Sequence, residues 1–268
     1  MGLVNGKIAL VTGGGSGLGR ACAETLAREG AQVVVTDIDD EGMAATVASI
    51  EKQGGAALYH HHDTTDEAAW QSVLGEVQSR CGGLHILVNN AGIAIGGPLW
   101  EMTLDDWRRQ NAVNLDGVFL GTKHAIPLID QSGGGSIIIM SSVAGLRGSP
   151  GLAGYGASKG GVRLFAKSAA LECAAAGLKV RVNSVHPGII DTPIWTKFPT
   201  GGMGGGANAI DPEALASATV AHRAGRPGEI ADGVLYLASD LASYVNGSEL
   251  VIDGGIMAGG GTRSIVQN

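Results

Sequence analysis

Tyr155 and Lys159 are the residues whose types and spacing point most directly to chemistry. They lie near the start of a helix expected over 155–176, and a spacing of four places the phenol and the ammonium on one helix face. Tyrosine has an ordinary pKa of about 10, so it serves as a base near neutral pH only when a nearby cation stabilises the phenolate. Lys159 supplies that cation. The pair predicts acid/base catalysis by Tyr155, although composition alone would produce such a spacing in about one sequence in ten.

Two polar residues upstream could complete such a site. Ser142 follows an apolar run and lies 13 residues before Tyr155, where its hydroxyl could hydrogen-bond a substrate oxygen as charge develops on it. Ser141 is the adjacent alternative, with its side chain on the opposite face of the strand. Asn114 lies in the helix expected before that strand, where a buried amide needs a partner. It could hold a water that passes protons to Lys159, or it could simply kink the helix.

A glycine-rich loop follows the first apolar run of the chain. It reads TGGGSGLG over 12–19 and opens an expected helix over 17–29. Gly13 permits a tight turn, Gly17 lets the backbone approach a pyrophosphate, and Gly19 allows close packing, while the positive end of the helix faces the phosphate. Ser16 and Leu18 complete the loop. A plain structural turn is the alternative in a chain with 45 glycines, but the strand before the loop and the helix after it favour dinucleotide binding.

A carboxylate at the end of the second apolar run indicates which dinucleotide is bound. Asp37 lies 24 residues beyond Gly13, where it can accept hydrogen bonds from both ribose hydroxyls of NAD. It would repel the 2′-phosphate of NADP, and neither Ser16 nor Ile38 offers a cation to offset that repulsion. The sequence therefore predicts NAD, with an exposed acid at a strand end as the alternative.

Three further residues follow the next two strands and are predicted to contact the adenosine part of the cofactor. Asp63, with Thr64 beside it, could accept from the adenine amino group, and the turn at Asn90 would bring backbone against the ribose. Ordinary turns at strand ends would explain these residues nearly as well.

The elements that must position these residues alternate between strand and helix. Strands are expected at 7–12, 31–37, 56–63, 84–90, 136–142, 179–187 and 248–254, and helices at 17–29, 40–53, 67–80, 104–129, 155–176 and 229–238. This pattern predicts an α/β fold, a Rossmann-type doubly wound sheet of seven parallel strands with helices on both faces, and one domain over 1–268. Ligands bind outside the carboxyl ends of such strands, where the candidate residues fall.

Composition argues against several classes of partner. The net charge of −7 is spread along the chain with no basic patch, so neither nucleic acid nor a membrane surface is expected as a partner. No apolar stretch reads as a signal peptide or a membrane span, and Cys22, Cys81 and Cys173 form no C-x-x-C pair, which indicates reduced thiols and a cytoplasmic protein. The run 60–62 of three histidines invites a metal interpretation, but strand neighbours point to opposite faces, so no metal site is predicted.

Together these motifs resemble the short-chain dehydrogenase/reductase family over essentially the whole chain: TGGGSGLG, the acidic end of the second strand, NNAG, Asn114, Ser142, YGASK and PGIIDTP. The resemblance implies a tetrad of Asn114, Ser142, Tyr155 and Lys159, with Lys159 also binding the nicotinamide ribose. It further implies that the segment with Pro187, Ile190 and Thr192 binds the carboxamide. His186 is not a general feature of the family and is interpreted as structural. The implied activity is an NAD-dependent hydride transfer between an alcohol and its ketone.

The same resemblance implies a lid over the substrate at about 192–218. Ile194, Trp195, Phe198 and Met203 lie around a glycine-rich stretch there, Lys197 is the lid's one cation, and Trp100, Leu146 and Leu152 could form the opposite wall. These residues predict a small apolar substrate, a cyclic, aromatic or steroidal secondary alcohol or its ketone, although they could equally pack the lid onto the body.

Other functions and an oligomer complete the expectations. A 3-oxoacyl-carrier-protein reductase would share the tetrad but usually uses NADPH, which Asp37 opposes. A non-catalytic NAD sensor need not keep the tetrad, and an epimerase or dehydratase would need an added substrate domain. The resemblance implies a homotetramer assembled through the helices at 104–129 and 155–176 and the last strand. The glycine-rich tail 257–268 could be ordered by a neighbouring subunit.

Overall fold

The computed structural model of the chain describes residues 2–196 and 210–259. One sheet of seven parallel strands runs through it in the order β3-β2-β1-β4-β5-β6-β7. The strands are β1 (Ile8–Thr12), β2 (Gln32–Asp37), β3 (Ala56–His61), β4 (Ile86–Asn89), β5 (Gly135–Met140), β6 (Val180–Pro187) and β7 (Glu249–Ile252). The order reverses between β1 and β4, which is where a doubly wound sheet opens a crevice for ligands. The predicted fold is confirmed.

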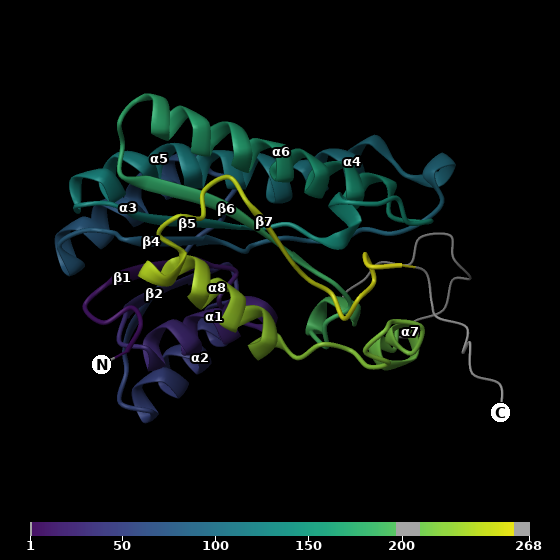
Figure 1. The fold of residues 1–268 in the computed structure, drawn as a ribbon, viewed down its shortest axis with the longest axis horizontal. Coiled ribbons are helices and arrows are strands. Elements are labelled where there is room, and N and C mark those ends of the chain that lie inside the picture. Colours follow the sequence, from purple (N-terminus) through teal and green to yellow (C-terminus); the bar gives the residue numbers. More distant parts are fainter. Residues whose placement is uncertain (1, 197–209, 260–268) are drawn as a thin grey trace.

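Helices cover both faces of this sheet (Figure 1). On one face lie α1 (Gly17–Arg28), α2 (Asp40–Lys52) and α8 (Pro227–Ala238), and on the other lie α3 (Glu67–Cys81), α5 (Gly117–Gln131) and α6 (Ala153–Ala175). Successive residues of β1 alternate between the two layers, with Ala9 and Val11 in the core beneath α1 and α8 and Leu10 in the core beneath α3, α5 and α6. Because both faces are covered, the central strands β1 and β4 are buried along their whole length.

The expected single helix over 104–129 is wrong in one respect. The chain forms α4 (Leu104–Asn111), then one π-helical segment over Ala112–Asp116, and only then α5. Asn114 lies in the π-helical segment, fully buried. Apolar periodicity does not reveal an extra residue within one turn, whereas such turns often occur at functional sites.

Smaller differences concern element ends and short helices. The third strand ends at His61 instead of Asp63, α8 begins at Pro227 instead of Glu229, and α7 (Pro212–Ala216) was not expected. Within α7, the Asp211 carboxylate accepts from the Glu213 amide at the N-terminus, and Pro212 occupies the first turn. In the described ranges, no helix is both long and apolar enough to span a bilayer.

Candidate active site

Lys159 lies directly beneath the ring of Tyr155 in the first turns of α6. Its Nζ is 5.7 Å from the centre of the phenol ring and donates to the Met140 carbonyl at 2.8 Å. Burial lowers the pKa of Lys159 to about 8, because removing an ammonium from water disfavours its charged form. The fold therefore places a desolvated cation within electrostatic range of the tyrosine.

Ser142 is the serine that reaches Tyr155. Burial raises the pKa of the Tyr155 phenol, and a hydrogen bond with the Ser142 side chain opposes that rise. The Ser142 Oγ also accepts from the Ala144 amide at 3.1 Å, at the start of the 3₁₀ turn Val143–Gly145 that follows β5. Ser141, the alternative, is buried and donates to the Lys159 carbonyl at 2.8 Å, so its hydroxyl fastens α6 to β5.

Asn114 contacts the loop after β4 through its whole amide. Its Oδ1 accepts from the Ile93 amide at 2.8 Å, and its Nδ2 donates to the Ile93 carbonyl at 2.8 Å and to the Ser158 hydroxyl at 3.0 Å. Gln110, four residues earlier, accepts from the Ile95 amide at 2.9 Å. Gln110 is a site residue that was not predicted, although its helical spacing from Asn114 is a signal that both side chains meet the same loop.

Gly92 separates Asn114 from Lys159. A Cβ at this position would lie 3.2 Å from the Asn114 Oδ1 and 3.3 Å from the Lys159 Nζ. Two polar groups therefore face one exposed stretch of bare backbone, and the absence of a side chain keeps the space between them open. This role of Gly92 within NNAG was not anticipated.

The glycine loop has the backbone that its sequence predicts. Gly13 and Gly17 have φ of +65° and +52°, values that favour glycine, and a Cβ on Gly19 would overlap the Gly13 carbonyl oxygen. Ser16 precedes the first turn of α1, and Leu18 packs against the core below. The Asn90 side chain donates to the carbonyls of Thr12 and Gly13 at 2.9 and 3.2 Å, so it supports the loop from beneath.

Asp37 connects the glycine loop to the start of α2. Its Oδ2 accepts from the Gly15 amide at 2.9 Å, and its Oδ1 accepts from the Ile38 amide at 2.8 Å. Arg20 is the cation near this loop, and its guanidinium donates to the Gly15 carbonyl at 2.6 Å and to the Thr46 hydroxyl at 2.9 Å. The carboxylate is thus fixed at the end of β2 while the neighbouring cation is bound to protein oxygens.

Asp63 and Thr64 differ in what they offer. The Asp63 carboxylate is exposed and accepts from the backbone and hydroxyl of Thr65 at 2.9 and 2.8 Å. The Thr64 side chain is buried against Gly117. Asp63 is therefore the accessible residue of this pair.

The loop after β6 returns to the glycine loop. A Cβ at Gly17 would lie 3.5 Å from the Thr192 Cβ, so the segments expected to bind the pyrophosphate and the carboxamide lie next to each other. Pro187 ends β6, while Ile190 bridges to Gly225 and accepts from the Trp195 indole at 2.6 Å.

Part of the expected lid can be placed. Ile194 and Trp195 are half-buried and lie in the 3₁₀ turn Pro193–Trp195. Leu146 and Leu152 are also half-buried, whereas Trp100 is 86% exposed. Lys197, Phe198 and Met203 lie outside the described residues.

The three consecutive histidines face three different partners. His60 contacts Glu76 at 3.2 Å, His61 contacts Asp40 at 2.9 Å, and His62 points inward to the Thr36 hydroxyl at 3.2 Å. Their ring nitrogens do not converge on one point. Across residues 2–196 and 210–259, no cluster of three or more His, Cys, Asp or Glu side chains could bind a metal ion.

Comparisons with known proteins agree over almost the whole chain. A family model described as Enoyl-(Acyl carrier protein) reductase matches residues 13–257. Cyclopentanol dehydrogenase of Comamonas testosteroni is 42% identical over 258 residues, covering 96% of this chain and 100% of the relative. The NADP-dependent (R)-specific alcohol dehydrogenase of Lentilactobacillus kefiri is 40% identical over 260 residues, covering 95% and 98%. The crystal structure of a short-chain type dehydrogenase/reductase from Mycobacterium marinum matches with a TM-score of 0.87 and 33% identity, covering 96% and 97%.

Proposed function

The chain belongs to the short-chain dehydrogenase/reductase family, and we propose that it is an NAD-dependent enzyme that interconverts a secondary alcohol and its ketone. The observation that carries this proposal is the pairing of a buried ammonium with the Tyr155 phenol, 5.7 Å from the ring centre, while Ser142 hydrogen-bonds to the same phenol. When bound, the cofactor accepts a hydride in alcohol oxidation and donates one in ketone reduction.

The protein's own residues then divide the remaining work. In oxidation Tyr155 accepts the proton of the substrate hydroxyl, and in reduction it returns a proton to the carbonyl oxygen. The Ser142 hydroxyl stabilises that oxygen as its charge changes, and the Lys159 ammonium stabilises the phenolate. Asn114 keeps the loop after β4 beside Lys159, and because both its amide hydrogens bond to Ile93 and Ser158, only its Oδ1 could also accept from the water predicted from the sequence.

The cofactor cradle fits a dinucleotide in its backbone shape. At Gly13 a Cβ would lie 2.9 Å from the Ala91 Cα, so only bare backbone leaves room at this turn. The proposed contacts are Gly13, Ser16, Gly17, Leu18 and Gly19 with the pyrophosphate, Asp37 with the adenosine ribose, Asp63 and Asn90 with the adenosine part, with the buried Thr64 next to Asp63, Tyr155 and Lys159 with the nicotinamide ribose, and Pro187, Ile190 and Thr192 with the carboxamide.

Charge around Asp37 supports NAD over NADP. Asp39, Asp40 and Glu41 follow directly, so a 2′-phosphate would meet several carboxylates. The single positive charge of Arg20, whose guanidinium donates to the Gly15 carbonyl and the Thr46 hydroxyl, does not balance these four carboxylates. The NADP-dependent relative at 40% identity means that overall similarity does not set the cofactor.

Cofactor kinetics with Asp37→Ala test this preference. We expect the wild type to favour NAD by at least about 100-fold in kcat/KM, and the variant to lose about 10- to 100-fold with NAD while gaining with NADP. Asp40→Ala is the matched control, an exposed acid three residues away that should keep the NAD kinetics within about twofold. An unchanged NAD preference in Asp37→Ala would contradict the assignment.

A cyclic secondary alcohol is the proposed substrate class. It is supported by the half-buried apolar residues Leu146, Leu152, Ile194 and Trp195 and by the cyclopentanol named for one relative. NADH production with aliphatic, cyclic and steroidal alcohols, and NADH consumption with 3-oxoacyl thioesters, test it. Preference for the thioesters would favour the 3-oxoacyl-carrier-protein reductase alternative. A protein that binds NAD but turns over nothing would be the sensor.

A homotetramer in the cytoplasm completes the proposal. Phe119 on α5 and Leu164 and Leu171 on α6 are exposed, as are Tyr244 and Val251 near the last strand, which supports assembly through both regions. Light scattering that gave a monomer would contradict it. Three free cysteines support a reducing compartment. Tail residues 260–268 lie outside the described part of the chain.

A further inference from the structure

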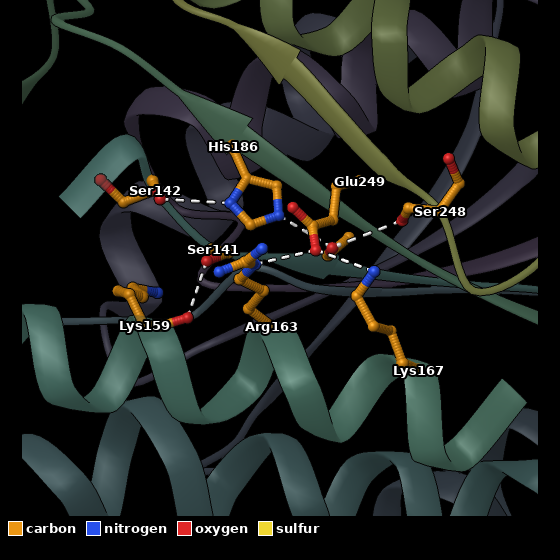
Figure 2. A network of polar contacts seen from close by, with 9 residues as sticks. Ser141, Ser142, Lys159, Arg163, Lys167, His186, Ser248 and Glu249 are labelled. Carbon is orange, nitrogen blue, oxygen red and sulfur yellow. Dashed lines mark hydrogen bonds and ion pairs between the residues drawn. The ribbon is translucent and has the colours of Figure 1, made fainter. Parts of the chain in front are cut away.

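His186 is a fully buried histidine with both ring nitrogens engaged. It lies on β6, where its Nδ1 is 3.2 Å from the Ser142 carbonyl and its Nε2 is 2.9 Å from the Ser184 hydroxyl (Figure 2). No other side chain is described in contact with the Ser142 carbonyl. The imidazole therefore connects β6 to the segment that carries Ser142.

Hydrogen-bond chemistry fixes the tautomer of this imidazole. A carbonyl oxygen only accepts, so Nδ1 must carry the proton and donate to Ser142. Nε2 is then an acceptor, so the Ser184 hydroxyl donates to it. That hydroxyl has a single hydrogen, and the Ser248 carbonyl, its other neighbour, is more distant at 3.4 Å.

Both the carbonyl and the hydroxyl of Ser142 are therefore held by hydrogen bonds. Its carbonyl accepts from the Gly145 amide at 2.9 Å as well as from His186, and its Oγ accepts from the Ala144 amide at 3.1 Å. Accepting at Oγ leaves the hydroxyl proton free to donate to the phenol or to a substrate oxygen. We propose that His186 is a positioning residue, whose Nδ1–H fixes the Ser142 peptide so that the Ser142 hydroxyl points at the reacting oxygen.

Burial is the main reason that His186 is neutral, since desolvation disfavours the imidazolium and lowers its pKa. The Ser142 carbonyl and the Glu249 carboxylate on β7 oppose this shift by raising the pKa. Glu249 is paired with Arg163 at 2.8 Å and Lys167 at 2.9 Å, both on α6, and these two cations lower the pKa again (Figure 2). A neutral ring with one donor and one acceptor is the form that this network requires.

Two substitutions at position 186 distinguish the hydrogen bond that His186 donates from the space that its side chain fills. His186→Leu removes the donor, and we expect kcat to fall about 10- to 100-fold, the range typical when the support of a functional residue is lost. His186→Asn places an amide nitrogen near the Nδ1 position and should restore kcat to within about threefold. NADH affinity, measured by fluorescence, should stay within about twofold in both variants, since the cofactor loop is untouched.

His85→Leu is the matched control. This half-buried histidine accepts from the Ile8 amide at 3.1 Å at the amino-terminal edge of the sheet, so its loss should lower Tm and leave kcat unchanged. If His186→Leu does not fold, His186→Gln decides, because its amide reaches the Nε2 position beside Ser184 but places no donor at the Nδ1 position that faces the Ser142 carbonyl. A fall in kcat for His186→Gln supports the proposal, and wild-type kcat overturns it.

The pH profile supplies a readout that a purely structural role would not move. The Ser142 hydrogen bond lowers the pKa of Tyr155, so a misplaced Ser142 should shift the rising limb of alcohol oxidation to higher pH in His186→Leu. This inference rests on the proposed function and falls with it if the wild type oxidises no alcohol. With an active wild type, an unshifted limb and a kcat within about twofold in His186→Leu overturn the positioning role alone.

Discussion

The two halves of the site are built in different ways. In the cofactor half, backbone shape dominates: the glycine loop, Asp37 and the first turn of α1 come from one continuous stretch of 25 residues, 13–37. In the catalytic half, side chains dominate, and Asn114, Ser142, Tyr155 and His186 come from separate segments. Local geometry thus shapes one half, while contacts between distant elements assemble the other.

Two buried histidines make the same contrast. His186 in the catalytic half has a partner on each ring nitrogen. His62, next to Asp63 in the cofactor half, contacts Thr36 and the edge of Trp70, with ring centres 4.3 Å apart, but its Nε2 has no hydrogen-bond partner among the described residues. The His186 ring thus links Ser142 to Ser184, whereas the His62 ring packs in the core.

Removing the phenol hydroxyl should produce the largest effect and should be confined to the catalytic half. We expect Tyr155→Phe to lower kcat by about 10²- to 10⁴-fold, because the acid/base group is lost. The dissociation constant for NADH should change little, since the phenol is only one of the proposed cofactor contacts and Lys159, Asp37 and the glycine loop remain. Steady-state kinetics with fluorescence titration check both. Near-normal turnover would refute the mechanism, and a parallel loss of NADH binding would break the division into halves.

Acid should destabilise the fold through His62. Burial lowers its pKa from 6.5 to about 4, so between these values the unfolded chain binds a proton that the folded chain does not. The contribution of His62 to the free energy of unfolding is therefore fully present above pH 6.5. It declines as the pH falls towards 4, by up to about 3 kcal/mol. Urea unfolding of the wild type and His62→Leu across that range isolates it. If both proteins lost the same free energy of unfolding as the pH fell, His62 would not be the cause of the acid destabilisation.

A methyl group on Gly92 should give a smaller effect, again in the catalytic half. Gly92→Ala places a Cβ 3.2 Å from the Asn114 Oδ1 and 3.3 Å from the Lys159 Nζ, and we expect kcat to fall about tenfold as these groups move apart.

Gly75→Ala is its control. This exposed glycine within α3 has nothing near its Cβ position, so alanine should raise stability by about 0.5–1 kcal/mol without changing kcat. Thermal unfolding and kinetics of both variants distinguish them. Wild-type kcat in Gly92→Ala would show that the space beside Lys159 is not required.

Features that depend on residues close together in sequence were predicted correctly. Every long element was expected except the break at Asn114, and the spacing of Tyr155 and Lys159 placed both on one helix face. Contacts between segments that are far apart in sequence were predicted less well. Asn90 supports the glycine loop with its side chain, and Gln110 and Gly92 were not recognised, because their partners belong to other elements.

The alternation of strands and helices, the glycine loop with its acidic strand end, and the Tyr155–Lys159 pair can all be predicted from the amino-acid order. They follow from hydrophobic periodicity, turn chemistry and helical spacing, which act over a few residues. Three features depend on the folded arrangement instead: Ser142 and not Ser141 reaches the phenol, Asn114 lies in a π-helical turn, and His186 contacts Ser142. Those outcomes depend on how β5, β6 and α6 pack together, and packing brings together residues whose separation in sequence carries no signal.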